Sequence, residues 1–72
     1  MKNNLKIHTP FIRLKDALKF AALVENGGNA KQVILEGKVT VNGEICTVSG
    51  KKLVAGDVFI YSGEEFIITD EN

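Results

Sequence analysis

Apolar positions along this 72-residue chain follow a helical period up to about residue 37 and a period of two after it. In the stretch after Arg13, apolar residues recur every three or four positions, which predicts a helix with one buried face. Gly27 and Gly28 are expected to end this helix, because glycine adopts the left-handed cap conformation at little cost. The buried face is predicted to consist of Leu14, Ala17, Leu18 and Ala21.

A second, shorter helix is predicted over residues 30–36. Asn29 is expected to be its N-cap, and Gln32, three positions later, completes the pattern of a capping box. Gly37 follows the last apolar position and is expected to stop the helix. Lys31 falls in the first turn, where a cation is unfavourable for the helix dipole, which hints at a purpose other than helix stability.

Short alternating runs predict strands on both sides of the helices. Residues 5–9 are expected to form an edge strand that ends before Pro10. Asn42-Gly43 predicts a hairpin with a type I′ turn, which needs positive φ at both residues, and Ser62-Gly63 predicts another. The later strands are expected within residues 38–41, 44–48, 57–61 and 64–69. The fold class is therefore α+β, with two short helices packed on a small mainly antiparallel sheet, in a single domain over residues 1–72.

Composition argues against several classes of function. Cys46 is the lone cysteine, which excludes an internal disulfide and favours a reducing, cytoplasmic setting. One cysteine and one histidine, His8, do not make a typical zinc site, and no nucleophile–base–orienter set is present. No apolar run approaches the roughly 18–20 residues of a membrane span. We therefore expect no catalytic residues, no metal or cofactor, no small-molecule substrate and no membrane partner, and a monomer.

The net charge of zero conceals an asymmetry along the chain. All nine basic residues and only four acidic ones lie in residues 1–52, which gives this part a net charge of +5. The last twenty residues contain five acidic residues and no basic one. This distribution suggests a basic binding face with an acidic side turned away from it, and chance clustering of solvated charges is the alternative.

Two short stretches are candidates for contact with an anion, and both also have a plain structural interpretation. The amides before the second helix, from Gly27 to Asn29, can hold a phosphate that Lys31 also reaches, but the same residues are explained by capping alone. The pair Lys51-Lys52 is either part of a basic surface or a solvated turn.

The order and spacing of several motifs resemble a known family. These are Arg13-Leu14 opening a helix, the segment from Ala30-Lys31 through Ile34 and Gly37 to Val39-x-Val41-Asn42-Gly43, and Gly56-Asp57. The pattern resembles the RNA-binding domain named after ribosomal protein S4, the alpha-L motif, and in particular its small stand-alone bacterial members of the YbcJ/YaaA type. The resemblance covers about residues 11–68. Where such members usually carry a basic pair, this chain has Val48 and Ser49.

The resemblance implies two helices on a small antiparallel sheet and a helix-side surface that contacts structured RNA. It places Arg13, Gly28, Asn29 and Lys31 at helix starts that meet the RNA backbone, and Lys38, Lys51 and Lys52 at flanking basic positions. Lys15, beside Arg13, completes the expected set of RNA-binding residues, which is Arg13, Lys15, Gly28, Asn29, Lys31, Lys38, Lys51 and Lys52.

The function expected from this resemblance is that of a non-catalytic, ribosome-associated module that binds ribosomal or transfer RNA mainly through phosphate contacts. A protein-interaction adaptor of the ribosome or another assembly is the alternative, favoured by the zero net charge and by Val48 and Ser49. A ubiquitin-like sulfur carrier is a weaker rival, because such a protein needs a C-terminal Gly-Gly and this chain ends in Asp70-Glu71-Asn72.

Overall fold

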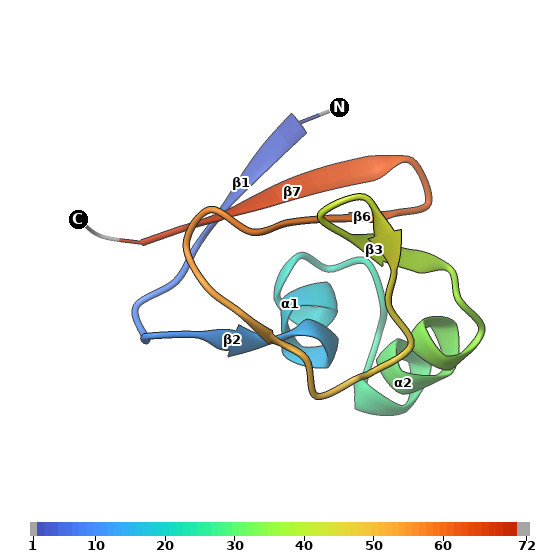
Figure 1. Ribbon diagram of the computed structural model, residues 1–72. Coiled ribbons are helices and arrows are strands. Elements are labelled where there is room, and N and C mark those ends of the chain that lie inside the picture. Colours follow the sequence, from blue (N-terminus) through green and yellow to red (C-terminus); the bar gives the residue numbers. More distant parts are fainter. Residues whose placement is uncertain (1, 71–72) are drawn as a thin grey trace.

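The structure is a computed structural model that describes residues 2–70 (Figure 1). Glu71, one of the acidic residues counted above, lies outside the described residues. The two helices are α1 (Leu14–Phe20) and α2 (Gly27–Leu35). The strands are β1 (Lys2–Lys6), β2 (Ile12–Arg13), β3 (Val39–Val41), β4 (Glu44–Ile45), β5 (Lys52–Leu53), β6 (Val58–Tyr61) and β7 (Glu64–Thr69).

Five strands form the main sheet, in the order β1-β7-β6-β3-β4. Strand β1 runs parallel to β7, and the other three pairs are antiparallel. The predicted fold class, two short helices with a mainly antiparallel sheet, is thus confirmed. The first strand does occupy an edge of the sheet, but it covers Lys2–Lys6 instead of residues 5–9, so His8 lies in the bend after it.

A second, two-stranded sheet was not expected from the sequence. Strand β2 pairs antiparallel with β5, with Ile12 opposite Leu53 and Arg13 opposite Lys52. Each strand has only two residues, which is too short for an alternating pattern to show. The pairing matters because it joins the start of α1 to a segment almost forty residues later: the Leu14 N–H donates to the carbonyl of Lys51 at 2.8 Å.

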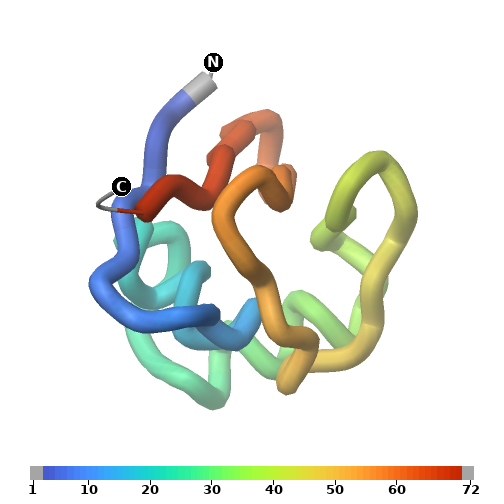
Figure 2. The backbone as a smooth tube through the Cα atoms, turned by 60° about the vertical axis from the view of Figure 1, so that its left-hand side comes forward, coloured from blue at the N-terminus to red at the C-terminus, as the bar shows by residue number. Residues whose placement is uncertain are grey.

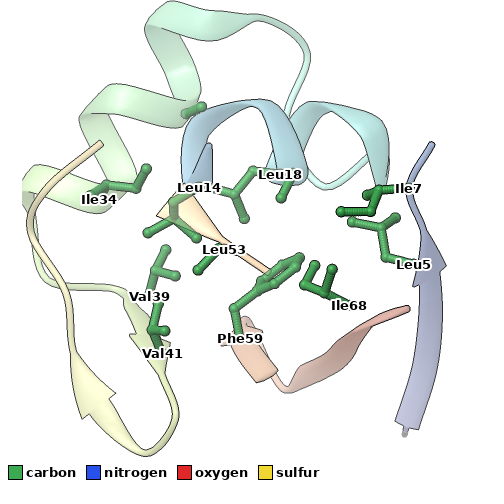
Figure 3. Packing of buried hydrophobic residues seen from close by; sticks show 12 residues of the cluster. Leu5, Ile7, Leu14, Leu18, Ile34, Val39, Val41, Leu53, Phe59 and Ile68 are labelled. Atoms are coloured by element: carbon green, nitrogen blue, oxygen red, sulfur yellow. The ribbon is translucent and has the colours of Figure 1, made fainter. Parts of the chain in front are cut away.

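One hydrophobic core lies between the helices and the main sheet, and Figure 3 shows its side chains converging from both. Leu14, Ala17 and Leu18 are fully buried, as the helical spacing predicts. The largest buried side chain, Phe59 of β6, stacks on Phe66 with ring centroids 5.3 Å apart. Over residues 3–70, the buried residues are Leu5, Ile7, Leu14, Ala17, Leu18, Ala30, Ile34, Val39, Val41, Leu53, Phe59 and Ile68.

The end of α1 differs from the prediction. The helix stops at Phe20, and Ala22, with φ of 59°, takes the left-handed position that was assigned to Gly27 and Gly28. The N–H groups of Ala22 and Leu23 donate to the carbonyls of Lys19 and Leu18 at 2.9 and 3.0 Å, the hydrogen-bond pattern of a Schellman motif. Because alanine adopts this conformation only at a cost, the sequence carried no signal for the cap.

The start of α2 was also misplaced by three residues. Asn26, not Asn29, is the N-cap, and its side-chain Oδ1 accepts from the Asn29 N–H at 2.9 Å. Gly28 lies inside the first turn, where an added Cβ would meet that capping oxygen at 3.2 Å. The helix ends as predicted, with Gly37 at φ of 75°. The capping hydrogen bond of Asn26 therefore explains a glycine at position 28 without any contact to a ligand.

The Asn42-Gly43 turn links two parts of the main sheet. Asn42 and Gly43 both have positive φ, 52° and 88°, as the type I′ prediction requires, and Ser62-Gly63 repeats the geometry. The Asn42 carboxamide also crosses to the segment before β6: its Oδ1 accepts from Val58 N–H at 3.0 Å and its Nδ2 donates to Asp57 at 3.2 Å. Asp57 in turn accepts from Val54 N–H at 2.8 Å. The distant Asn42-Gly43 and Gly56-Asp57 motifs are thus one hydrogen-bonded unit.

Candidate functional site

Four basic residues meet where the two-stranded sheet joins α1, and we call Arg13, Lys15, Lys51 and Lys52 the basic cluster. Arg13 and Lys52 are cross-strand partners on β2 and β5, so their side chains leave the same face of this sheet. The Arg13 guanidinium also lies against the loop before β5, 3.6 Å from where a Cβ of Gly50 would stand. Residues far apart in sequence thereby form one positive surface.

Phe11 supports two of these cations. The Lys52 ammonium lies 4.8 Å from the centre of the Phe11 ring, and the Arg13 guanidinium lies 5.8 Å from it. Both distances fall within cation–π range, where the negative face of the ring attracts the charge. Phe11 is only half-buried, so its ring can face these two charged groups at the surface.

The loop of residues 49–51 caps the first turn of α1. It thereby brings Lys51, and Lys52 directly after it, close to the start of that helix. The Lys15 N–H donates to the Ser49 carbonyl at 3.1 Å, beside the bond from Leu14 to Lys51. The Lys51 N–H donates to the carbonyl of Val48 at 3.2 Å, and this hydrogen bond closes a turn in the loop. Carbonyl groups of the loop therefore occupy amides of α1 that would otherwise be open to an anion, so the cluster acts through its side chains.

The cations of the cluster have no acidic partner within residues 2–70, where no carboxylate forms an ion pair with any of the four. Lys19 and Lys38 differ, since they pair with Asp16 at 3.6 Å and with Glu36 at 3.1 Å. Arg13, Lys51 and Lys52 are exposed, and Lys15 is partly exposed. Their positive charge is therefore available to an external anion.

The acidic part of the chain lies elsewhere. Strand β7, which begins with Glu64 and Glu65, belongs to the main sheet, and Figure 1 shows it apart from β2 of the two-stranded sheet. The separation agrees with the charge asymmetry of the sequence.

Gly28, Asn29 and Lys31 lie on α2, apart from the two-stranded sheet. Both views place the first turn of α2 at the same end of the molecule as the loop of residues 49–51 (Figures 1 and 2). Lys31 is exposed there. Asn29 borders a groove of about 290 Å³ that also includes Glu25 and Tyr61. The predicted residues of α2 thus flank the basic cluster and do not belong to it.

Lys38 occupies a third position, in the turn between α2 and β3. Its ammonium contacts Glu36, whose other carboxylate oxygen accepts from the Gln32 side chain at 2.8 Å. The Gln32 hydrogen bond, followed by the hydrogen bond and the charge of Lys38, lowers the pKa of Glu36 below its ordinary value of 4.5. Of the predicted basic residues, Lys38 is the one already paired with a carboxylate.

A groove beside the basic cluster was not predicted from the sequence. It has a volume of about 500 Å³, follows β4 and the loop after it, and reaches Lys51. Val48 and Ile45 line it while remaining 60% and 67% exposed. Their exposure was not foreseeable, because alternation in the run 44–48 reads as an ordinary strand, whereas the strand stops at Ile45.

No helix within residues 2–70 is long and apolar enough to cross a membrane. That part of the chain also has no group of three histidine, cysteine or acidic side chains placed to hold a metal ion.

Comparison with known proteins places this arrangement in a family. A sequence model of the S4 domain matches residues 5–69. A Bacillus subtilis (strain 168) protein named "Probable ribosome maturation protein RlbA" is 40% identical over 63 residues, which cover 88% of this chain and 89% of that protein. YbcJ of Escherichia coli (strain K12) is 39% identical over 54 residues, 75% of this chain and 77% of YbcJ.

The fold agrees with a solved structure. The solution structure of Escherichia coli YbcJ, described as revealing an alfa-L motif involved in RNA-binding, superposes with a TM-score of 0.67 and 32% identity. The match covers 94% of this chain and 85% of YbcJ. From the matched residues, the level of identity and the shared fold, the chain belongs to the S4 domain family.

Proposed function

We propose that this protein is a non-catalytic RNA-binding module that holds structured RNA, ribosomal or transfer RNA, on the surface formed by the basic cluster and the first turn of α2. The observation that carries the proposal is the convergence of Arg13, Lys51 and Lys52 without an acidic partner within residues 2–70. A phosphate backbone is the polyanion that such a surface suits best.

The proposed contacts are mainly to phosphate and sugar. Arginine and lysine on short strands and a helix start present hydrogen-bond donors only, which bind phosphate oxygens and position a protein without reading the base sequence. Phe11 is engaged by two cations, so it holds their charges in place and is not a free stacking platform. Duplex RNA, recognised by shape and backbone, is thus a better match than an unstructured single strand.

The relatives support the same conclusion. YbcJ is described as having a motif involved in RNA-binding, and the name of the Bacillus relative refers to ribosome maturation. By analogy, this protein acts in the cytoplasm on ribosomal RNA, as a monomer.

An adaptor that binds a protein is the second candidate, and one observation favours it. Strand β4 is the edge of the main sheet, and its Ile45 side chain is 67% exposed. Exposed edges of this kind accept an added strand from a partner.

Chemical-shift mapping distinguishes the two candidates. A uniformly ¹⁵N-labelled protein is titrated with a short RNA hairpin at low salt, and the amide signals are followed by NMR. RNA binding at the proposed surface predicts the largest shifts in residues 13–15, 49–52 and 27–31, with small shifts in β7. Shifts confined to β4, or no shifts with any folded RNA, would contradict the proposal.

A further inference from the structure

The groove along β4 has two apolar walls and two charged residues of opposite sign. Ile45 and Val48 supply apolar walls, and Lys51 and Glu44 supply the charges. Within residues 2–70, the Glu44 side chain has no hydrogen bond or ion pair, so its carboxylate is free to accept. Large apolar side chains left in water beside such uncommitted polar groups are the features expected of a ligand site.

The two charged residues come from opposite ends of the segment 44–51 that lines this groove. Glu44 follows the Asn42-Gly43 turn, and Lys51 immediately precedes β5. In both views the loop between β4 and β5 runs from that hairpin down to the two-stranded sheet, so it spans the distance between them (Figures 1 and 2). A ligand lying along the loop therefore meets a cation at one end, apolar side chains in the middle and an acceptor at the other end.

We propose that this groove takes one unpaired nucleotide extruded from the RNA bound to the basic cluster. The inference rests on the proposed function, because Lys51 belongs to both the cluster and the groove. The phosphate of this nucleotide lies at Lys51, and its base packs between Ile45 and Val48. The Watson–Crick edge of the base faces Glu44. Extruded bases in bulges and loops are the part of structured RNA that proteins read by sequence.

Glu44 gives the groove a preference among bases. An ionised carboxylate only accepts hydrogen bonds, so it pairs with the exocyclic amino group of cytosine, adenine or guanine. Uracil has no amino group, and its single donor on that edge, the N3–H, lies between two carbonyl oxygens that repel the carboxylate. The groove therefore favours amino-bearing bases over uracil, and the carboxylate also excludes a second phosphate from that end.

The test compares two fluorescein-labelled RNA hairpins that differ by one bulged cytidine, titrated at about 50 mM salt, where phosphate contacts are strong. Wild-type protein is expected to bind the bulged hairpin about five- to tenfold more tightly, the order expected for burying one base against apolar side chains. The variant Ile45→Ser/Val48→Ser is expected to reduce this preference to less than about twofold. Its affinity for the unbulged hairpin is expected to stay unchanged.

The matched control is Phe20→Ser/Leu35→Ser, which removes two side chains that are 59% and 63% exposed outside the groove. It should keep the full preference, and circular dichroism checks that both double variants fold. A third variant, Glu44→Gln, is expected to remove the preference for bulged cytidine over bulged uridine.

Equal affinity of the wild-type protein for the two hairpins would overturn the inference alone, whereas the absence of binding to either would overturn the proposed function as well. If the preference for the bulged hairpin survives in Ile45→Ser/Val48→Ser, the inference is also overturned. A strand of a partner protein is then the better candidate ligand for the groove.

Discussion

Ala22 offers a direct test of how α1 ends. It stands at the left-handed C′ position of a Schellman motif, with φ of 59°. The equivalent residue of α2 is Gly37, with φ of 75°. The two helices thus end in the same way with different residues, and exchanging those residues isolates the conformational cost.

The expected effect follows from two opposing terms. An L-residue in the left-handed conformation costs roughly 1–2 kcal/mol, which Ala22→Gly removes. Glycine also makes the unfolded chain more flexible, which costs about 0.4–1 kcal/mol. We therefore expect Ala22→Gly to raise the free energy of unfolding by about 0.5–1 kcal/mol, since Ala22 is exposed and loses no packing. For a chain of this size the melting temperature rises by about 2–8 °C.

Urea unfolding followed by circular dichroism measures the change, with two controls. Ala21→Gly, at an adjacent position with φ of −81°, should destabilise the protein, because glycine gains nothing there. Gly37→Ala should lower the free energy of unfolding by about 0.5–1 kcal/mol, since the added Cβ meets Ile45 at an ordinary 3.5 Å and only the backbone is strained. Destabilisation by Ala22→Gly equal to that by Ala21→Gly would refute the assignment of the cap.

Three further variants test other contacts. Phe11→Leu removes both cation–π contacts and should weaken RNA binding about two- to fivefold. The salt dependence of the affinity should not change, because no charge is lost. An unchanged affinity in fluorescence anisotropy would contradict this prediction. Gln32→Ala and Lys38→Gln should each raise the pKa of Glu36, because each removes a hydrogen bond that lowers it, and a carboxyl NMR titration in which neither variant raises that pKa would count against this. Because that pKa is lowered by folding, the stabilisation by Gln32 is present above pH 4.5 and is lost as the pH falls through the folded value. Asn42→Ala should lower the free energy of unfolding by about 2–3 kcal/mol in urea unfolding, because it removes two side-chain hydrogen bonds and strains the turn. Asn42→Gly removes the same hydrogen bonds without the strain and should lower it less. Equal losses in the two variants would show that the positive φ has no energetic effect.

The sequence was sufficient for the features that depend on local chemistry. Helical spacing identified the buried face of α1, and Asn42-Gly43 identified a turn whose geometry needs positive φ. Gly37 marked the end of α2 for the same reason. In each case the residue type itself carries the preference.

The remaining features depend on contacts between distant segments. The pairing of β2 with β5 involves two residues on each side and brings Arg13 beside Lys52, which no local pattern records. Ala22 adopts a conformation that its side chain disfavours, because the packed helix determines it. Asn26 and Asn29 are both capable N-caps, and only the folded backbone chooses between them. The residues of the candidate site stay a prediction, and only the structure shows which of them lie together.

The most direct test of RNA binding through the basic cluster is the salt dependence of affinity for a structured RNA, measured with matched charge variants. Arg13→Gln/Lys52→Gln removes two unpaired cations, and Lys19→Gln/Lys38→Gln removes two cations that already pair with carboxylates. Each phosphate contact contributes about −0.7 to −0.9 to the slope of log affinity against log salt concentration. We therefore predict that the first variant makes the slope shallower by about 1.4–1.8 and that the second leaves it nearly unchanged. Equal slopes for the two variants, or no binding of wild-type protein to folded RNA at low salt, would contradict the account.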